Sequence, residues 1–106
     1  MFYEIRRYHA RHGRRDDWVR YMEDVVIPFQ QSKGMDVTGS FIDEEDPEAY
    51  VWIRRFEDEA QRVSLYSAIY DSPRWTDEIA PVVADLLDRD KTVITRVAPT
   101  PVSALR

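Results

Sequence analysis

Apolar and polar positions along the chain predict seven elements in the order β-α-β-β-α-α-β. Residues 35–45 alternate between apolar and polar side chains, which is typical of a half-buried strand. Residues 14–32 instead carry apolar side chains at three- and four-residue steps, which favours an amphipathic helix. By the same criteria we expect strands at residues 2–10, 35–45, 49–56 and 91–98, and helices at 14–32, 58–70 and 74–88.

Proline and glycine place the breaks between these elements. Pro28 falls late in the first predicted helix and is expected to kink it or end its regular part, and Gly34 is a plausible stop signal. Asp46-Pro47-Glu48 predicts the turn of a hairpin. Pro73 breaks the second helix and suits the first turn of the third.

This element order predicts an α+β fold of the ferredoxin-like, split βαβ type. The expected sheet is antiparallel, with four strands in the order 4-1-3-2 and all helices on one face. The other face is then bare, although both faces carry apolar bulk, so we expect a homodimer joined sheet to sheet. We expect one domain over residues 1–98 and an extended C-terminal tail over 99–106, because Pro99 and Pro101 cannot continue a central strand.

Composition narrows the function classes. The 106 residues carry a net charge of −5, which works against binding to nucleic acid or to an anionic membrane. The chain has no cysteine, which fits a reducing cytoplasm and removes thiolate chemistry. No apolar run approaches the ~20 residues of a membrane helix, and the strand pattern after Met1 predicts no signal peptide.

Charged and aromatic side chains follow one face of two strands that the predicted order makes neighbours. They are Glu4, Arg6 and Tyr8 on the first strand, and Trp52, Arg54 and Phe56 on the third. If the register allows, a carboxylate and two guanidinium groups meet beside an indole. Such a group could bind an anionic or aromatic ligand, or it could be a structural Glu–Arg network at the dimer interface.

Tyr66, Tyr70 and Trp75 gather around the break at Pro73. They either belong to the core or line a pocket between helices and sheet. His9, at the end of the first strand, has a side chain suited to proton transfer near neutral pH. Candidate ligand-binding residues are therefore Glu4, Arg6, Tyr8, Trp52, Arg54 and Trp75, and candidates for proton transfer are His9, Tyr66 and Tyr70.

We expect no metal and no cofactor. His9 and His12, the only histidines, stand three residues apart across a turn, a poor ligand pair. The acidic run at 43–48 lacks the glycine and the spacing of a calcium loop. With three glycines in the whole chain, phosphate-binding loops are not expected either.

Several segments together resemble the NIPSNAP family, and the resemblance covers roughly residues 2–98. They are Phe2–Tyr8, Gly13, Pro28, Gln30-Gln31, Gly39-Ser40-Phe41, Val51–Phe56 with Arg62, and Tyr70–Trp75. None of these segments is catalytic in character, and the specificity lies in their order and spacing. The resemblance implies the fold of the dimeric α+β barrel superfamily and a dimer.

Two hypotheses of function follow. The first is a homodimeric protein of uncharacterised function that binds a small organic ligand or acts as a scaffold. The alternative is a cofactor-independent monooxygenase or isomerase acting on a small aromatic or carboxylate-bearing substrate, as the wider barrel superfamily suggests by analogy. In that case Arg6 or Arg54 would clamp an anion. An enclosed pocket with converging Arg, Tyr and Trp side chains favours the enzyme, whereas a filled interior favours the non-enzymatic binding or scaffold protein.

Overall fold

The computed structural model describes all 106 residues. Its element order confirms the predicted β-α-β-β-α-α-β arrangement, with both long helices divided into segments. The elements are β1 (Phe2–Ala10), α1 (Arg15–Tyr21), η1 (Met22–Val26), α2 (Ile27–Ser32), β2 (Asp36–Ile42), β3 (Ala49–Phe56), α3 (Glu59–Tyr70), η2 (Arg74–Ile79), α4 (Ala80–Leu86) and β4 (Leu87–Val97). No helix is long and apolar enough to cross a membrane.

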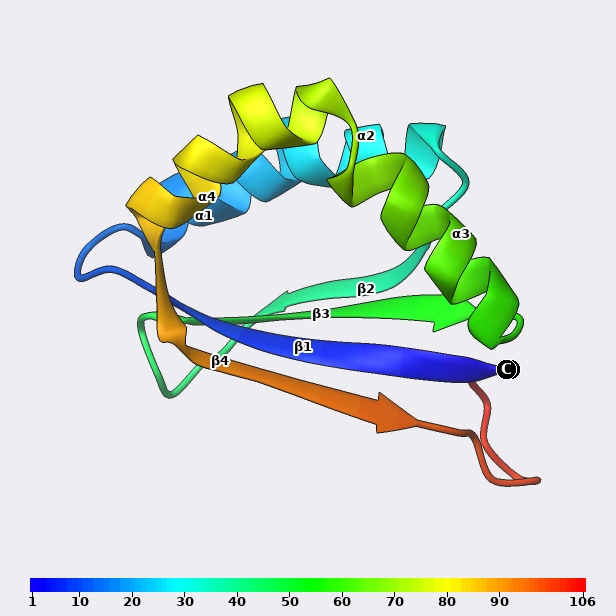
Figure 1. Ribbon diagram of the computed structural model, residues 1–106. Helices are drawn as coiled ribbons and strands as arrows, with labels where there is room; N and C mark the ends of the chain where they lie inside the picture. Colours follow the sequence, from blue (N-terminus) through cyan, green and yellow to red (C-terminus); the bar gives the residue numbers. More distant parts are fainter.

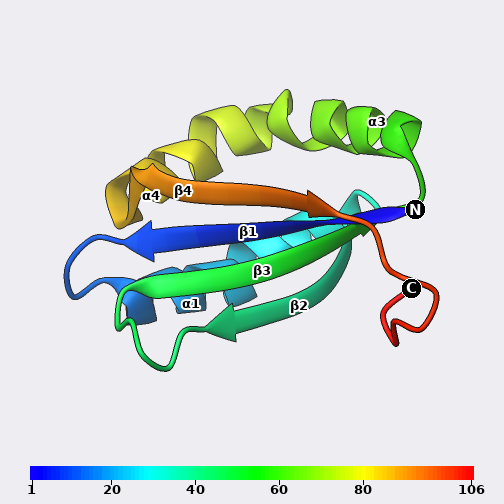
Figure 2. The same ribbon diagram turned by 90° about the horizontal axis from the view of Figure 1, so that it is seen from below.

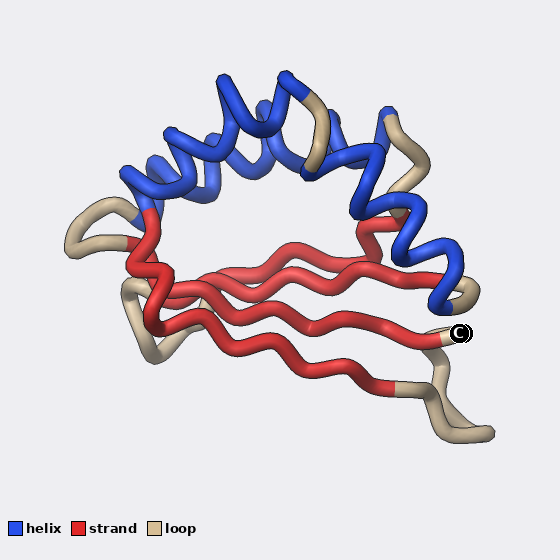
Figure 3. Tube along the Cα trace, in the orientation of Figure 1, coloured by secondary structure: helices blue, strands red, loops and turns tan.

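The four strands form one antiparallel sheet in the order β2-β3-β1-β4, which is the predicted order. All helices lie on one face of this sheet (Figures 1 and 3). The view from below shows that no helix covers the other face (Figure 2). We call these the inner and the outer face. Even-numbered residues of β1 and β3 point inward, so the inner face carries the charged and aromatic set singled out in the sequence.

The first helix (α1, η1 and α2) and the third helix (η2 and α4) each contain a π-helical turn just before a proline. Segment η1 ends two residues before Pro28, and η2 ends two residues before Pro81. The wider hydrogen bonds are explicit, since the N–H of Ile27 bonds to the carbonyl of Met22 and that of Ala80 to the carbonyl of Trp75. A proline ring clashes with the carbonyl four residues earlier and lacks an N–H, so a wider turn relieves both problems. The first helix therefore continues past Pro28 instead of ending there.

Two predictions for the end of the chain are wrong, and the first concerns the boundary between the third helix and the last strand. The third helix ends at Leu86, and β4 begins at Leu87 without a loop, whereas the sequence predicted a helix to 88 and a strand from 91. Arg11 explains the early end, because its side chain donates to the carbonyls of Ala84 and Asp85, and its backbone N–H to that of Leu86. The last carbonyls of the helix are thus satisfied from outside.

The predicted extended tail is the second correction. After Val97 the chain turns back, with the N–H of Ser103 bonded to the carbonyl of Thr100 at 3.0 Å. It forms a small hook beside the outer face (Figure 2). A shallow groove separates this hook from Ile5 and Ile53. The rest of the outer face remains uncovered in the single chain.

Local chemistry explains the other breaks. Asp58 caps α3 by accepting a hydrogen bond from the N–H of Gln61 at 2.8 Å. Gly34, the predicted stop signal, has a φ of +99°, a conformation that suits glycine. β2 ends at Ile42 and not at 45, because the Asp43 carboxylate accepts the N–H groups of the next turn. Arg15 fastens that turn to the first helix through three backbone carbonyls.

Candidate functional site

The inner faces of β1 and β3 bring the predicted residues together. Glu4 lies opposite Arg54, and Arg6 lies opposite Trp52, so the register condition set by the sequence is met. The network is covered by helices and is not at an exposed sheet surface, which corrects the structural alternative that placed it at a dimer interface. It separates two apolar clusters, one around Trp52 and one around Phe56.

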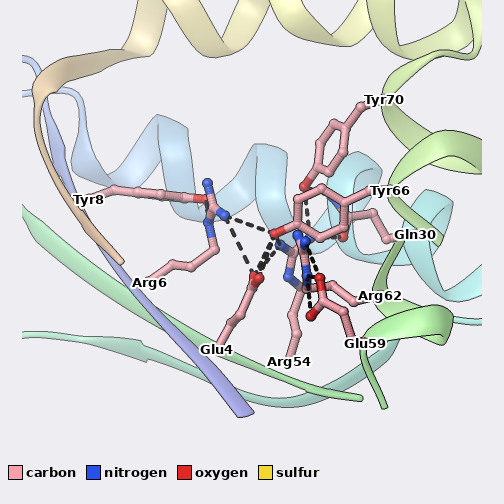
Figure 4. A network of polar contacts seen from close by, with 9 residues as sticks. All are labelled: Glu4, Arg6, Tyr8, Gln30, Arg54, Glu59, Arg62, Tyr66 and Tyr70. Carbon is pink, nitrogen blue, oxygen red and sulfur yellow. Dashed lines mark hydrogen bonds and ion pairs between the residues drawn. The ribbon is translucent and has the colours of Figure 1, made fainter. Parts of the chain in front are cut away.

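Arg54 lies at the centre of this network and is completely buried. Nη2 donates to Glu4 Oε1 at 2.8 Å and to the Tyr66 hydroxyl at 2.7 Å. Nη1 donates to Gln30 Oε1 at 2.9 Å and to the Tyr70 hydroxyl at 2.7 Å (Figure 4). Because arginine only donates, these bonds fix the orientation of the Gln30 amide, whose nitrogen then faces the Tyr70 hydroxyl at 3.3 Å. Arg54 is therefore held by α2 and α3 as well as by the sheet.

Glu4 is the only buried carboxylate among the residues of Figure 4, since Glu59, which accepts hydrogen bonds from Arg62, is about half exposed. Burial by itself raises the pKa of Glu4, but hydrogen bonds from Tyr66 and Arg54 and the charges of Arg54 and Arg6 outweigh it, so the pKa is lowered overall. Burial likewise lowers the pKa of Arg54, while Tyr70, Tyr66 and Glu4 raise it to above its ordinary value. Glu4 and Arg54 are thus both charged at neutral pH, as a buried ion pair.

Arg6 is placed differently from Arg54. Its Nε donates to the Tyr8 hydroxyl at 2.7 Å, and its Nη1 donates to the Tyr66 hydroxyl at 3.2 Å. Nη1 lies 3.6 Å from Glu4 Oε1, a looser ion pair than that of Arg54. The side chain is 17% exposed. Two guanidinium groups therefore share the one charge of Glu4, and the second guanidinium is the accessible one.

Beside Arg6 lies a cavity of about 350 Å³ between the sheet and the helices. Its apolar wall includes all three tryptophans of the chain, Trp18, Trp52 and Trp75. The remaining lining residues come from β1, η1, α3, α4 and β4: Arg6, Tyr8, Met22, Val26, Tyr70, Val83, Leu87, Arg89, Thr92 and Ile94. This volume is at the lower end of the range for small-molecule sites.

The cavity owes its shape to two kinds of backbone irregularity, π-helical turns and a β-bulge. Both π-helical turns contribute to the wall, η1 through Met22 and Val26 and η2 through Trp75. On the sheet side, pairing between β1 and β4 jumps from Arg7–Val93 to His9–Asp88, so residues 89–92 bulge opposite Tyr8. π turns and bulges are enriched at functional sites, which makes this the strongest candidate site of the chain.

The structure divides the predicted site residues into three groups. Arg6, Tyr8, Trp52, Trp75 and Tyr70 line the cavity. Glu4, Arg54 and Tyr66 form the buried network next to it (Figure 4). His9 is on the outer face, where Nε2 lies 3.0 Å from Asp46 Oδ2, so it cannot reach the cavity. No group of three or more His, Asp or Glu side chains is arranged to hold a metal ion.

Sequence reasoning missed Gln30 and Arg89. Gln30 is completely buried and accepts a hydrogen bond from Arg54. The sequence did indicate this position, because Gln30 follows Trp18, Met22 and Val26 at the same four-residue spacing and is the polar residue in that apolar series. A polar residue on the buried stripe of a helix needs a partner in the core. Arg89 had no such signal, because the predicted helix end concealed the bulge that carries it.

Comparisons with known proteins agree on family and fold. The NIPSNAP family model matches residues 3–103. A NIPSNAP family protein of unknown function from Agrobacterium tumefaciens is 28% identical, with 100% of this chain and 94% of that chain covered and a TM-score of 0.89. A second from the same organism is 19% identical over 99% and 98%, with a TM-score of 0.88. An antibiotic biosynthesis monooxygenase shares the fold at 16% identity, over 95% and 100%, with a TM-score of 0.69. No curated protein matches.

Proposed function

The chain belongs to the NIPSNAP family, and from that premise we propose that it binds a small organic molecule in the cavity between sheet and helices. The observation that carries this proposal is the composition of the wall, where three tryptophans and two tyrosines stand beside two guanidinium groups, the partly buried one of Arg6 and the exposed one of Arg89. A purely structural interior would be filled by side chains at this point. Aromatic side chains with a few polar groups are the usual lining of a ligand site.

The buried network gives the cavity a rigid structural support. Arg54 joins β3 to α2 and α3 through Gln30, Tyr66 and Tyr70. These bonds hold the helices at a fixed distance from the sheet, next to the cavity. A site held by such a shell loses little conformational freedom when a ligand binds, which favours affinity.

Tryptophan fluorescence tests this proposal directly, because every tryptophan of the chain lines the cavity. A set of small aromatic and aliphatic compounds should include members that shift the emission and raise the melting temperature with saturation. Val83→Phe, which fills the cavity, should abolish both effects. Val63→Phe, on an exposed helix position, should change neither. If no compound of this size shifts the emission, the proposed function is wrong.

The enzymatic alternative stays a prediction, because the cavity offers hydrogen-bond donors and no evident base. Burial raises the pKa of Tyr8, and it raises that of Tyr66 beside the cavity to about 12. Both hydroxyls therefore keep their protons at neutral pH and cannot accept another group's proton efficiently. Of the other two candidates for proton transfer, His9 is on the opposite face, and the Tyr70 hydroxyl oxygen already accepts hydrogen bonds from Arg54 and Gln30. Binding is the function that these groups support best.

We further propose that the chain forms a homodimer through the outer sheet face, in the cytoplasm. A row of paired positions crosses that face, Phe41, Val51, Arg7 and Val93. Phe41 and Val93 are each more than half exposed in the single chain. Three of these four side chains are apolar, and apolar side chains on an uncovered sheet face favour a partner. The cytoplasmic location is consistent with the cysteine-free composition, and fractionation of cells producing the tagged chain would test it.

A further inference from the structure

The charged residues that line the cavity all have the same sign. They are Arg6 and Arg89, and no Asp or Glu contributes to the wall. The whole chain has a net charge of −5, so this positive cavity is set against the overall charge. Negative ligands gain from such local complementarity even when the net charge of the protein opposes it.

The network behind the cavity leaves part of this positive charge unbalanced. Glu4 is the one acidic group there, and its shortest ion pair is with Arg54, at 2.8 Å. Arg6 reaches the same carboxylate only at 3.6 Å, and its Nη2 has no hydrogen-bond partner in the protein. A partly buried guanidinium without its own counter-ion is well suited to bind an anion from outside.

Two hydroxyl groups that line the cavity with Arg6 donate no hydrogen bond within the protein. The Tyr8 oxygen accepts a hydrogen bond from Arg6, and the Tyr70 oxygen accepts from Arg54 and Gln30. Neither hydroxyl donates to any group of the protein, in contrast to Tyr66, which donates to Glu4 at 2.6 Å. Because Tyr8 and Tyr70 both line the cavity, the cavity presents two hydroxyl donors together with the Arg6 guanidinium.

From this geometry we infer that the ligand is a small monocarboxylate with an aromatic body. Its carboxylate would accept hydrogen bonds from Arg6 Nη2 and from the hydroxyls of Tyr8 and Tyr70. Its body would pack against Trp18, Trp52 and Trp75. One carboxylate balances the single excess positive charge of Glu4, Arg6 and Arg54, and the solvent-exposed Arg89 of the wall is not part of this balance. This inference rests on the proposed function and adds the chemical class of the ligand.

The test compares acids with their neutral amides, which have nearly the same shape. Phenylacetate, 3-phenylpropanoate and 4-phenylbutanoate are titrated beside the corresponding amides, with tryptophan emission and calorimetry as readouts. At least one acid should bind about tenfold or more tightly than its amide, because a charge-assisted hydrogen bond is lost in the amide. Acetate, which lacks the aromatic body, should bind far more weakly than that acid.

Variants assign the preference to Arg6. Arg6→Met should bring acid and amide to similar affinity, and Arg6→Lys should retain part of the preference because the charge remains. Tyr8→Phe should weaken binding of the acid more than binding of the amide, because a hydroxyl donates a stronger hydrogen bond to a carboxylate than to an amide oxygen. Circular dichroism and melting of each variant establish that it is folded, and Tyr8→Phe covers the case in which Arg6→Met fails to fold.

The outcomes separate this inference from the proposed function. The carboxylate inference is wrong if amides bind as tightly as acids and if Tyr8→Phe and Arg6→Met change the affinities of acids and amides by the same factor. The cavity would then still bind organic molecules. If acetate binds as tightly as the aromatic acids, the site is an anion site without a pocket for the body, which also overturns the inference. If neither acids nor amides bind, both proposals are wrong.

Discussion

Glu4 and Arg54 face each other directly on neighbouring antiparallel strands, and Glu4 Oε1 accepts a hydrogen bond from Arg54 Nη2 at 2.8 Å in the interior. Fifty positions separate them in the sequence, so the sheet register alone creates this pair. A buried ion pair is costly to break, because removing one partner leaves the other charged and unsolvated.

Arg54→Met should therefore lower the free energy of unfolding by about 3–5 kcal/mol, because Glu4 loses its counter-ion. Urea denaturation followed by circular dichroism measures the loss. Arg14→Met is the control, since Arg14 forms an exposed pair with Asp17 and should change stability by about 1 kcal/mol or less.

The double variant Glu4→Gln, Arg54→Met should lose less stability than the sum of the single losses, because neither charge is then left unpaired. Equal effects of Arg54→Met and Arg14→Met would show that the network does not stabilise the fold.

Acid should destabilise the protein through carboxylates with lowered pKa. Hydrogen bonds from the N–H groups of Asp46 and Glu45, and then Arg7, lower the pKa of Asp43 from 3.8 to about 2. A carboxylate of this kind contributes stability above its ordinary pKa, and the contribution is lost as the pH falls from 3.8 toward about 2. Hydrogen bonds from Arg62 and Arg96 lower the pKa of Glu59 from 4.5 to about 2, so Glu59 also loses its stabilising contribution as the pH falls through this range.

Urea midpoints measured between pH 7 and pH 2 should fall steeply below pH 4.5. Asp43→Asn should lower the midpoint at pH 7 and make the acid dependence shallower, because the titrating group is absent. Glu44→Gln is the matched control in the same turn, and its profile should follow that of the parent protein. Identical profiles for both variants would contradict the assignment to Asp43.

Phe41→Glu should dissociate the proposed dimer without unfolding the chain. Phe41 lies on the outer face opposite Val51 and is 53% exposed, so a charge there disturbs a partner more than the fold. Sedimentation of the parent protein at micromolar concentration should give about twice the chain mass of 12.6 kDa.

Val63→Glu changes a residue of similar exposure on α3 and should leave the dimer intact. A parent protein that sediments as a monomer at this concentration would overturn the dimer proposal.

Asp58→Ala should cost about 1 kcal/mol, because the first turn of α3 loses its side-chain cap. Since α3 carries Tyr66 and Tyr70, the same variant should also weaken binding of an effective acid by a small factor. Glu57→Ala, one residue earlier, removes a carboxylate but not the cap and serves as the control. Equal stability of the two variants would show that the cap contributes little.

Much of this architecture could be predicted from the sequence, because strand alternation and helical spacing are local signals. The sheet order and the inward set of β1 and β3 follow from them. The roles of the two arginines could not be separated in this way. Arg6 and Arg54 occupy equivalent positions on their strands, and only the helices above decide which one is enclosed by Gln30, Tyr66 and Tyr70.

The cavity could not be predicted either, because it depends on backbone irregularities. The bulge at residues 89–92 follows a helix that Arg11 ends early, and that contact is 73 or more positions away in sequence. Pro81 stood in the middle of a predicted helix. Its effect is a wider turn before it, which no apolar periodicity indicates.

Pro28 and Pro81 have a consequence for how this cavity can change over evolution or by design. Both are exposed to solvent, yet each fixes a widened turn whose inward side chains form the wall. Their missing N–H groups prevent the wide turn from migrating toward the end of the helix. The outline of the cavity is thus encoded at the molecular surface, while the lining residues remain free to vary. Ligand preference can diversify within a constant frame, one side chain at a time.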